Sequence, residues 1–193
     1  MIRWTPLLAL LVTFRALAVD PAMHSQSVIE DTGIDSQGLV SVNAGAGELH
    51  QQINARAIAI GTELATARLQ LRQELELQAL DLNQNAQVNL LGESFGHSSG
   101  LTGVNQTAGS GNQQINSFRL SLGRQRQDLD DSVLAQQLVA PAQPSGATEQ
   151  PKGSRIVVTD DKAFAGSRGV VQLNQSAGVG NRSVNSLSMT VVD

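Results

Sequence analysis

The sequence predicts an all-β protein built from stacked strand-turn-strand repeats. A 24-residue pattern occurs three times, starting at Gly38, Gly100 and Gly169, and the second half of each copy alternates as a β-strand does. Aromatic residues make up only 3% of the chain, too few for an ordinary globular core, which relies on large rings. Repeated units that cannot bury their own surface stabilise one another by stacking. We therefore expect a β-solenoid or cross-β stack interrupted by two linkers.

The N-terminus has the features of a secretory signal peptide. Arg3 precedes an apolar run over residues 6–14, and Ala16-Leu17-Ala18 forms a cleavage site. The apolar run is shorter than the about 20 residues that span a bilayer. We therefore expect export through the periplasm to the cell surface or the medium. We divide the chain into a signal peptide 1–18, an irregular leader 19–37, repeat 1 at 38–61, spacer 1 at 62–99, repeat 2 at 100–123, a flexible spacer 2 at 124–168 and repeat 3 at 169–193.

Charge and cysteine content exclude several classes of function. Loss of Arg3 and Arg15 with the signal leaves 11 of the 13 basic residues against 17 acidic residues, a net charge of −6. A chain this acidic is unsuited to nucleic acid. The chain contains no cysteine, so neither disulfides nor thiol chemistry are available. Stability must come from packing and hydrogen bonds.

Each repeat is predicted to form two strands joined by a glycine-rich turn. The first half is a short apolar run, such as residues 101–105 or 170–174. In the second half, side chains of one kind recur at every other position, the period of a strand. In repeat 2 the residues of one parity are Asn112, Gln114, Asn116, Phe118, Leu120 and Leu122. Repeat 1 is less regular because Arg56 falls on its apolar face. Both faces of the first strand carry aliphatic residues, so its inward face stays open.

The two spacers differ in composition. Residues 63–83 alternate apolar and polar side chains, which favours a strand, but they are also rich in Leu, Glu, Gln, Arg and Ala, which favour a helix. Both alternatives stay open for this first linker. Spacer 2 contains Pro141, Pro144 and Pro151 and is typical of a flexible linker in its middle. Residues 154–159 are predicted to add one short strand.

Asparagines recur in register through the three repeats and are the candidate assembly residues. If the units stack about 4.7–4.9 Å apart, then Asn54, Asn116 and Asn185 form a column. An amide has two donors and two acceptors, so each can bond to the copies above and below, as in cross-β amide ladders. The full candidate set is Asn43, Asn54, Asn105, Asn112, Asn116, Asn174, Asn181 and Asn185, with Gly47, Gly109 and Gly178 at the turns.

Two functions are compatible with such a stack. Because the last repeat runs to the end of this sequence, we expect its edge to stay uncapped and to accept another chain. Polymerisation by templated addition of identical rungs follows, without a cofactor or a chemical step. A monomeric surface or periplasmic solenoid that binds a ligand is the alternative, and it would produce the same repeat. A monomer that stays monomeric for days at high concentration would favour it.

Enzymatic and metal-binding functions find no support in the motifs. His24, His50 and His97 are far apart and lack the spacing of metal ligands. No nucleophile elbow or nucleotide-binding fingerprint occurs. The chain is therefore predicted not to be an enzyme and to need no cofactor. His50, however, sits beside the amide column, so its protonation is a candidate cause of pH-sensitive assembly.

The repeat resembles that of a known family of fibre subunits. The spacing Asn105/Gly109/Asn112/Asn116, which recurs as Asn174/Gly178/Asn181/Asn185, resembles the repeats of the Fap functional-amyloid subunits of Pseudomonas and, more loosely, curlin. The plan of a signal peptide and three imperfect repeats separated by variable linkers is also similar.

The resemblance implies an extracellular biofilm-matrix amyloid that supports adhesion. Its implied partners are itself, related fibre subunits, an outer-membrane export pore and a periplasmic chaperone. Two departures imply a minor or nucleating subunit. Repeat 1 carries His50 at the middle Asn position, and the Cys-X-Cys pair expected near the C-terminus of those subunits is missing.

Overall fold

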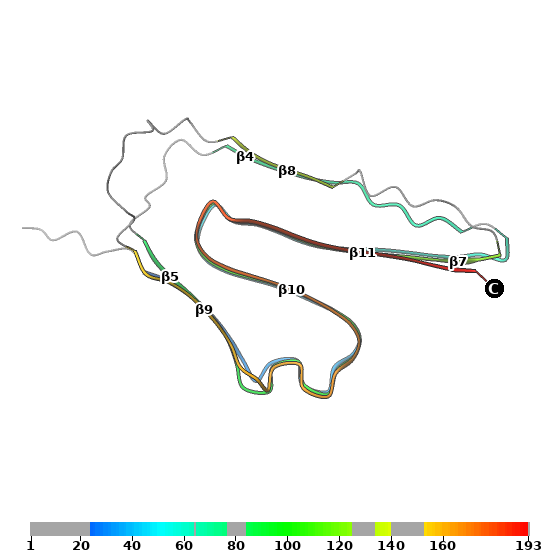
Figure 1. The fold of residues 1–193 in the computed structure, drawn as a ribbon, viewed down its shortest axis with the longest axis horizontal. Coiled ribbons are helices and arrows are strands. Elements are labelled where there is room, and N and C mark those ends of the chain that lie inside the picture. The colour runs from blue at the N-terminus through cyan, green and yellow to red at the C-terminus, as the bar shows by residue number, and fades with distance from the viewer. Residues whose placement is uncertain (1–23, 64, 77–83, 125–133, 140–152, 193) are drawn as a thin grey trace, which may run out of the picture.

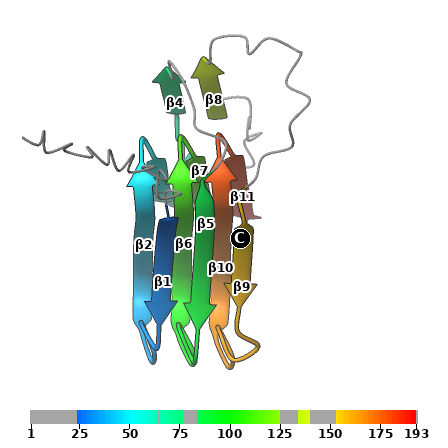
Figure 2. The ribbon, with the colours of Figure 1, turned by 90° about the vertical axis from the view of Figure 1, so that its left-hand side faces the viewer.

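The computed structural model describes residues 24–63, 65–76, 84–124, 134–139 and 153–192, and these form only strands, turns and connecting segments. Viewed down the stack, the three copies of the chain path lie almost on top of one another (Figure 1). Viewed from the side, their strands stand next to one another in parallel (Figure 2). The prediction of an all-β stack is confirmed. No helix of the described residues is long and apolar enough to cross a membrane, and the predicted signal peptide lies outside those residues.

Three parallel sheets make up the body, each with one strand from each third of the chain. The first holds β1 (His24–Glu30), β5 (Asn85–Leu91) and β9 (Arg155–Thr159). The second holds β2 (Gln37–Glu48), β6 (Ser99–Ser110) and β10 (Arg168–Val179). The third holds β3 (Gln51–Ile60), β7 (Gln113–Gly123) and β11 (Arg182–Val192). We call β1-β2-β3 the first rung, β5-β6-β7 the middle rung and β9-β10-β11 the third rung.

The rungs are in the register of the sequence repeat. β6 pairs residue for residue with β2 and β10, so Asn105 lies between Asn43 and Asn174. β7 pairs likewise with β3 and β11, which puts Asn116 between Asn54 and Asn185. This register places like residues next to one another in successive rungs. A slip of one residue would turn every side chain of a strand to the opposite face of its sheet.

Each rung is longer than the 24-residue repeat, because a third strand precedes each copy. The expectation that residues 19–37 are irregular is wrong for β1 (His24–Glu30), while the short strand expected at 154–159 is present as β9. The arches after β1, β5 and β9 differ in sequence but share a conformation. Backbone hydrogen bonds align Gly33 with Phe95 and Phe164, with φ of 70°, 58° and 60°. The sequence pattern did not predict β1, because β1, β5 and β9 and their arches share a backbone conformation but not a residue pattern.

The first linker is not helical where the structure describes it. β4 (Leu71–Glu76) is a strand that pairs in parallel with β8 (Leu134–Val139), in spacer 2. The helical alternative is wrong for this segment, because alternation turns Gln73 and Leu75 into the molecule, where both are buried. The Gln73 Nε2 donates to the carbonyl oxygens of Gln51 (2.9 Å) and Gln114 (3.2 Å). Residues 77–83 and the proline-rich part of spacer 2 at 140–152 lie outside the described residues.

The second sheet (β2, β6 and β10) has two buried faces of different chemistry. Toward the first sheet it packs an apolar core that includes Leu90, Phe95 and Val104, with the Phe95 and Phe164 rings stacked 5.4 Å apart. Toward the third sheet it presents Asn105, which is fully buried among amides. Aliphatic residues occur on both parities of the first strand of each repeat because both of its faces are covered.

Candidate assembly interface

Two columns of asparagine run through the stack between the second and third sheets. In one, Asn105 Nδ2 donates to Asn43 Oδ1 and Asn174 Nδ2 donates to Asn105 Oδ1, both at 3.0 Å. In the other, Asn116 Nδ2 donates to Asn54 Oδ1 and Asn185 Nδ2 donates to Asn116 Oδ1, again both at 3.0 Å. The structure thus brings six of the eight predicted asparagines into two continuous ladders.

The two ladders are joined to each other and to the backbone. Asn54 Nδ2 lies 2.8 Å from Asn43 Oδ1, and Asn116 Nδ2 lies 3.1 Å from Asn105 Oδ1. Asn116 Nδ2 also lies 3.0 Å from the Val104 carbonyl oxygen. Asn185 likewise donates to the Leu173 carbonyl of its own rung, whereas Asn105 donates to the Ile53 carbonyl of the preceding rung. The two strands of a rung and successive rungs are therefore held by the same amide groups. Buried amides satisfied in this way specify a register, since any other leaves polar groups unpaired.

The ladders have a direction. In both columns the Nδ2 of the later rung donates to the Oδ1 of the earlier rung. At the third rung, the Oδ1 of Asn185 accepts no hydrogen bond from any described residue. At the first rung, the Nδ2 of Asn54 donates only within its own rung, to Val42 O and Asn43 Oδ1. The two ends of the stack are therefore complementary rather than identical.

The third column is His50, Asn112 and Asn181, beside the turn. Asn181 Nδ2 donates to Asn112 Oδ1 at 2.9 Å, and Asn112 Nδ2 lies 3.2 Å from the carbonyl oxygen of Ala108. His50 reproduces this pattern. Its Nε2 lies 3.0 Å from the Ala46 carbonyl, and its Nδ1 lies 3.3 Å from the backbone nitrogen of Asn112. A carbonyl only accepts and a backbone N–H only donates, so these two contacts are both hydrogen bonds when the ring carries its proton on Nε2 and leaves Nδ1 to accept.

Acidification is expected to weaken the first rung through His50. A second proton would sit on Nδ1 and face the Asn112 N–H, replacing a hydrogen bond by two opposed donors at a cost of about 1–3 kcal/mol. The charged residues of the same surface hollow, Arg72 and Glu74, pair with each other at 2.6 Å.

The measurement is fibre growth at pH 5.5 and 7.5 for wild type and His50→Asn. We expect slower growth of wild type at pH 5.5 and a smaller difference for His50→Asn, which keeps a donor and an acceptor at this position. His24 and His97 are unchanged in both proteins, so they cannot cause a difference between them. Equal ratios of the two growth rates in both proteins would contradict this role of His50.

The predicted turn glycines lie one residue before the end of their strands rather than at the reversal itself. Gly47, Gly109 and Gly178 have φ of 106°, 110° and 121°, a region open to glycine. A Cβ on Gly109 would stand 2.0 Å from the Gly178 carbonyl oxygen, and one on Gly47 would stand 1.9 Å from that of Gly109. Gly47 and Gly109 thus need glycine both for their own backbone and for the close approach of the next rung, and Gly178 needs it for its own backbone.

Arg56 interrupts an otherwise apolar column at its first-rung end, where it is in register with Phe118 and then Leu187. Its guanidinium donates to the hydroxyl of Ser41 and to the backbone carbonyl of Val40. Burial lowers the pKa of the Arg56 guanidinium below its usual value. The arginine therefore ties β3 to β2 within the first rung, whereas the same column holds Phe118 in the middle rung and Leu187 in the third.

Glutamine ladders were not among the sequence-predicted sites. Gln113 Nε2 donates to Gln51 Oε1 at 2.9 Å, and Gln52 Nε2 donates to Gln114 Oε1 at 2.9 Å. Their signal was present in the sequence as the identical segment Gln-Gln-Ile-Asn in repeats 1 and 2. Repeat 3 has Arg182 and Ser183 in place of the two glutamines. A pattern required in all three copies therefore does not include the glutamines.

Both ends of the stack expose residues that the middle rung buries. Leu101 is 5% exposed, whereas its register partner Leu39 in the first rung is 62% exposed. Ile115 is fully buried, whereas its partner Val184 in the third rung is 44% exposed. The middle rung shows what a neighbour on each side does to these side chains. No group of three or more metal-binding side chains occurs in the described part of the chain.

Comparison with known proteins agrees with this geometry. The family model of the functional amyloid protein FapB/FapC family matches residues 14–192, nearly the whole chain. No solved structure matches the chain. The family is one of amyloid fibre proteins rather than of enzymes, which implies self-assembly into extracellular fibres. The chain, with its three stacked and asparagine-laddered rungs, belongs to the FapB/FapC functional amyloid family.

Proposed function

We propose that this chain polymerises head to tail, with the third rung of one copy receiving the first rung of the next. The fibre formed in this way lies outside the cell and supports adhesion and the biofilm matrix. The asparagine columns hold the register between copies as they do between rungs. Export through an outer-membrane pore with a periplasmic chaperone fits the predicted signal peptide.

The exposure of the end rungs is the observation that carries this proposal. β2 and β10 both pair with β6 along 12 residues in the same register, so the free edge of the third rung repeats the edge of the first rung that already receives the middle rung inside the chain. The end strands expose unpaired backbone groups and aliphatic side chains such as Leu39 and Val184, a template for further strands. Addition of another copy would bury both as the middle rung is buried.

A minor or nucleating role is supported by how the first rung differs from the other two. It has His50 in place of the middle asparagine, Arg56 in the apolar column and Gly33 opposite the stacked phenylalanines. An end of different composition pairs less perfectly with a third rung than a further asparagine-rich rung would. Such a subunit is suited to starting or joining a fibre of related subunits.

The test is incubation of the secreted chain at high concentration, followed by electron microscopy and fibre diffraction. We expect unbranched fibres with a meridional spacing of about 4.7–4.8 Å, the distance between stacked strands. Preformed fibres should shorten the lag of fresh protein, because an exposed third rung is the template. A protein that stays monomeric for days, or that binds a ligand saturably as a monomer, would contradict fibre formation and favour a surface or periplasmic binding module.

A further inference from the structure

Six aliphatic side chains form a continuous strip on one face of the third sheet. Ile58, Leu120 and Met189 are in register, and two residues further along Ile60, Leu122 and Val191 are in register. We call these six residues the apolar strip. It crosses all three rungs, so each added rung would extend it by two side chains.

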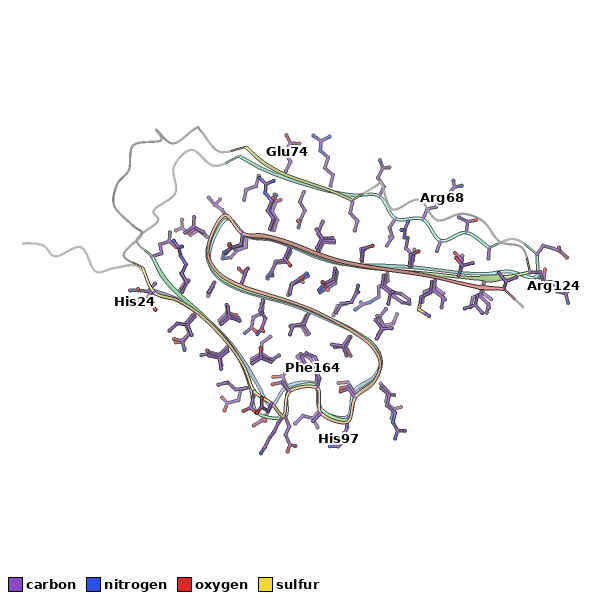
Figure 3. The ribbon with its side chains drawn as sticks, viewed as in Figure 1. His24, Arg68, Glu74, His97, Arg124 and Phe164 are labelled. Carbon is purple, nitrogen blue, oxygen red and sulfur yellow. The ribbon has the colours of Figure 1, made fainter. Side chains whose placement is uncertain are left out.

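The strip lies on the face of the third sheet that looks toward the second sheet, but beyond the end of that sheet. Ile58 and Ile60 have the parity of Asn54 and Arg56, whose side chains reach β2. The third sheet runs on past the bend where the second sheet turns away (Figures 1 and 3). The opposite face of this region is covered, since Ser121 is 2% exposed and accepts a hydrogen bond from the Ala67 N–H at 3.0 Å. The sheet is thus covered on one face only.

Stacking does not bury the strip. In the middle rung, which has a neighbour on each side, Phe118 is buried, whereas Leu120 and Leu122 on the same face stay partly exposed. In the end rungs, exposure of the strip rises to 73% at Ile60. A fibre built only by head-to-tail addition would therefore carry an uninterrupted aliphatic strip along its length. Long exposed apolar surfaces of this kind mark interaction sites.

We propose that the partner of this strip is the same strip on a second stack of this chain, so that two stacks pair side by side. This proposal depends on the head-to-tail stacking proposed above. The strip repeats with the spacing of the rungs, and another stack of this chain repeats identically, so contacts stay in register over any length. None of the six side chains is charged, so no like charges oppose each other across the contact. Two such faces can interdigitate as a dry zipper.

The size of the strip explains why pairing follows stacking. Six side chains per chain offer far less than the about 1,200 Å² that a stable protein interface buries. Two single chains therefore gain too little to associate through the strip. Stacked chains add their contributions along a shared contact, as multivalent binders do. The contact is thus a property of the fibre and leaves the monomer soluble.

The first experiment measures mass per length of fibres by scanning transmission electron microscopy. Three rungs of about 4.8 Å make up each chain, and about 18 kDa of the 20.3 kDa remains once the signal peptide 1–18 is removed, so a single stack has about 1.3 kDa per Å and a pair about 2.5 kDa per Å. We expect the paired value for wild type and the single value for Ile60→Thr/Val191→Thr, because threonine keeps the strand and removes the apolar contact. The matched control is Val28→Thr/Val158→Thr, which changes exposed valines of the first sheet and should leave fibres paired.

The second experiment uses the absence of cysteine from the chain. Ile58, Ile60, Leu120, Leu122, Met189 and Val191 are each replaced by cysteine, and fibres of each variant are oxidised. Within one stack, equivalent residues of successive copies are three rungs apart, about 14 Å, whereas a disulfide needs Cα atoms within about 7 Å. A disulfide-linked dimer can therefore form only across paired stacks. We expect dimers from at least one strip variant and none from Val28→Cys.

The outcomes separate this inference from the proposed function. Wild-type fibres of single-stack mass, or the absence of dimers from all six cysteine variants, would overturn pairing while leaving stacking intact. Paired fibres from Ile60→Thr/Val191→Thr would overturn the strip as the contact. Single wild-type fibres that bind phosphatidylcholine vesicles through the strip would replace the second stack by a lipid surface. Failure of wild type to form any fibre would overturn the stacking itself.

Discussion

Asn116→Leu is expected to raise the protein concentration needed for fibre growth by about a hundredfold or more. Asn116 is 1% exposed and donates toward Asn54 Oδ1 and Val104 O, while its Oδ1 accepts from Asn174 and Asn185. Leucine has nearly the same shape but neither donates nor accepts. Each buried group left unpaired costs about 1–3 kcal/mol, and a total of about 3 kcal/mol corresponds to a hundredfold change in an equilibrium constant.

The measurement is the concentration of soluble chain that remains when growth from fixed seeds has stopped. Asn89→Leu is the matched control, because Asn89 also lies in the middle rung but stands outside all three columns, where it accepts a bond from Gln87. Asn185→Leu should have a smaller effect within the chain, since only Asn116 and Leu173 are its partners there. Asn116→Leu fibres with the soluble concentration and morphology of wild type would contradict a register role for the ladder.

Gly178→Ala is expected to end a fibre at the third rung and to inhibit wild-type growth at substoichiometric amounts. Within the chain, a Cβ at this position comes within 2.8 Å of the flexible side chain of Arg155 and makes an ordinary contact with Asn181 Nδ2 at 3.5 Å. In the stack it would meet the carbonyl oxygen of Gly47 of the next copy, as a Cβ on Gly47 or Gly109 meets the next rung at 1.9 or 2.0 Å. The variant can therefore add through its first rung but cannot accept a successor.

The opposite end supplies the complementary variant. A Cβ on Gly38 has no atom within 4 Å inside the chain, but Cβ atoms on Gly100 and Gly169 would lie 2.1 Å from the carbonyl oxygen of the preceding rung. Gly38→Ala should therefore block the first rung and end fibres that grow in the other direction. Both variants carry backbone strain of about 1–3 kcal/mol from a positive φ. This strain would slow the addition of the variant itself, but it would not slow the growth of wild type in a mixture.

The measurement is seeded growth of wild type with one part variant in twenty, followed separately at each fibre end by fluorescence microscopy. We expect Gly178→Ala to stop one end and Gly38→Ala to stop the other. Gly109→Ala, whose clash lies inside the chain, should neither form fibres nor inhibit them. Unchanged growth at both ends in the presence of Gly178→Ala and of Gly38→Ala would contradict head-to-tail stacking.

Local patterns predicted the parts of this structure that repeat in residue type. The alternation around Asn116 and Asn185 predicted β7 and β11, and the asparagine spacing predicted which residues share a column. The arch strands β1, β5 and β9 were largely missed because their rungs repeat in backbone conformation only, with Gly33, Phe95 and Phe164 at one position. The segment around Gln73 was open to helix or strand, because its residue types favour one and its period the other.

The sequence by itself determined the strand repeats, their register and the family, since period-two alternation and gap-free spacing of like amides are properties of the chain order. Only the tertiary structure decided that β4 is a strand and that the second sheet is buried on both faces. It also decided that the His50 ring makes the hydrogen bonds that asparagine makes at this position in the other rungs. It also decided that the apolar strip stays open in a fully stacked rung. These depend on which distant segment covers a given face, and burial is set by neighbours in space that no local pattern specifies.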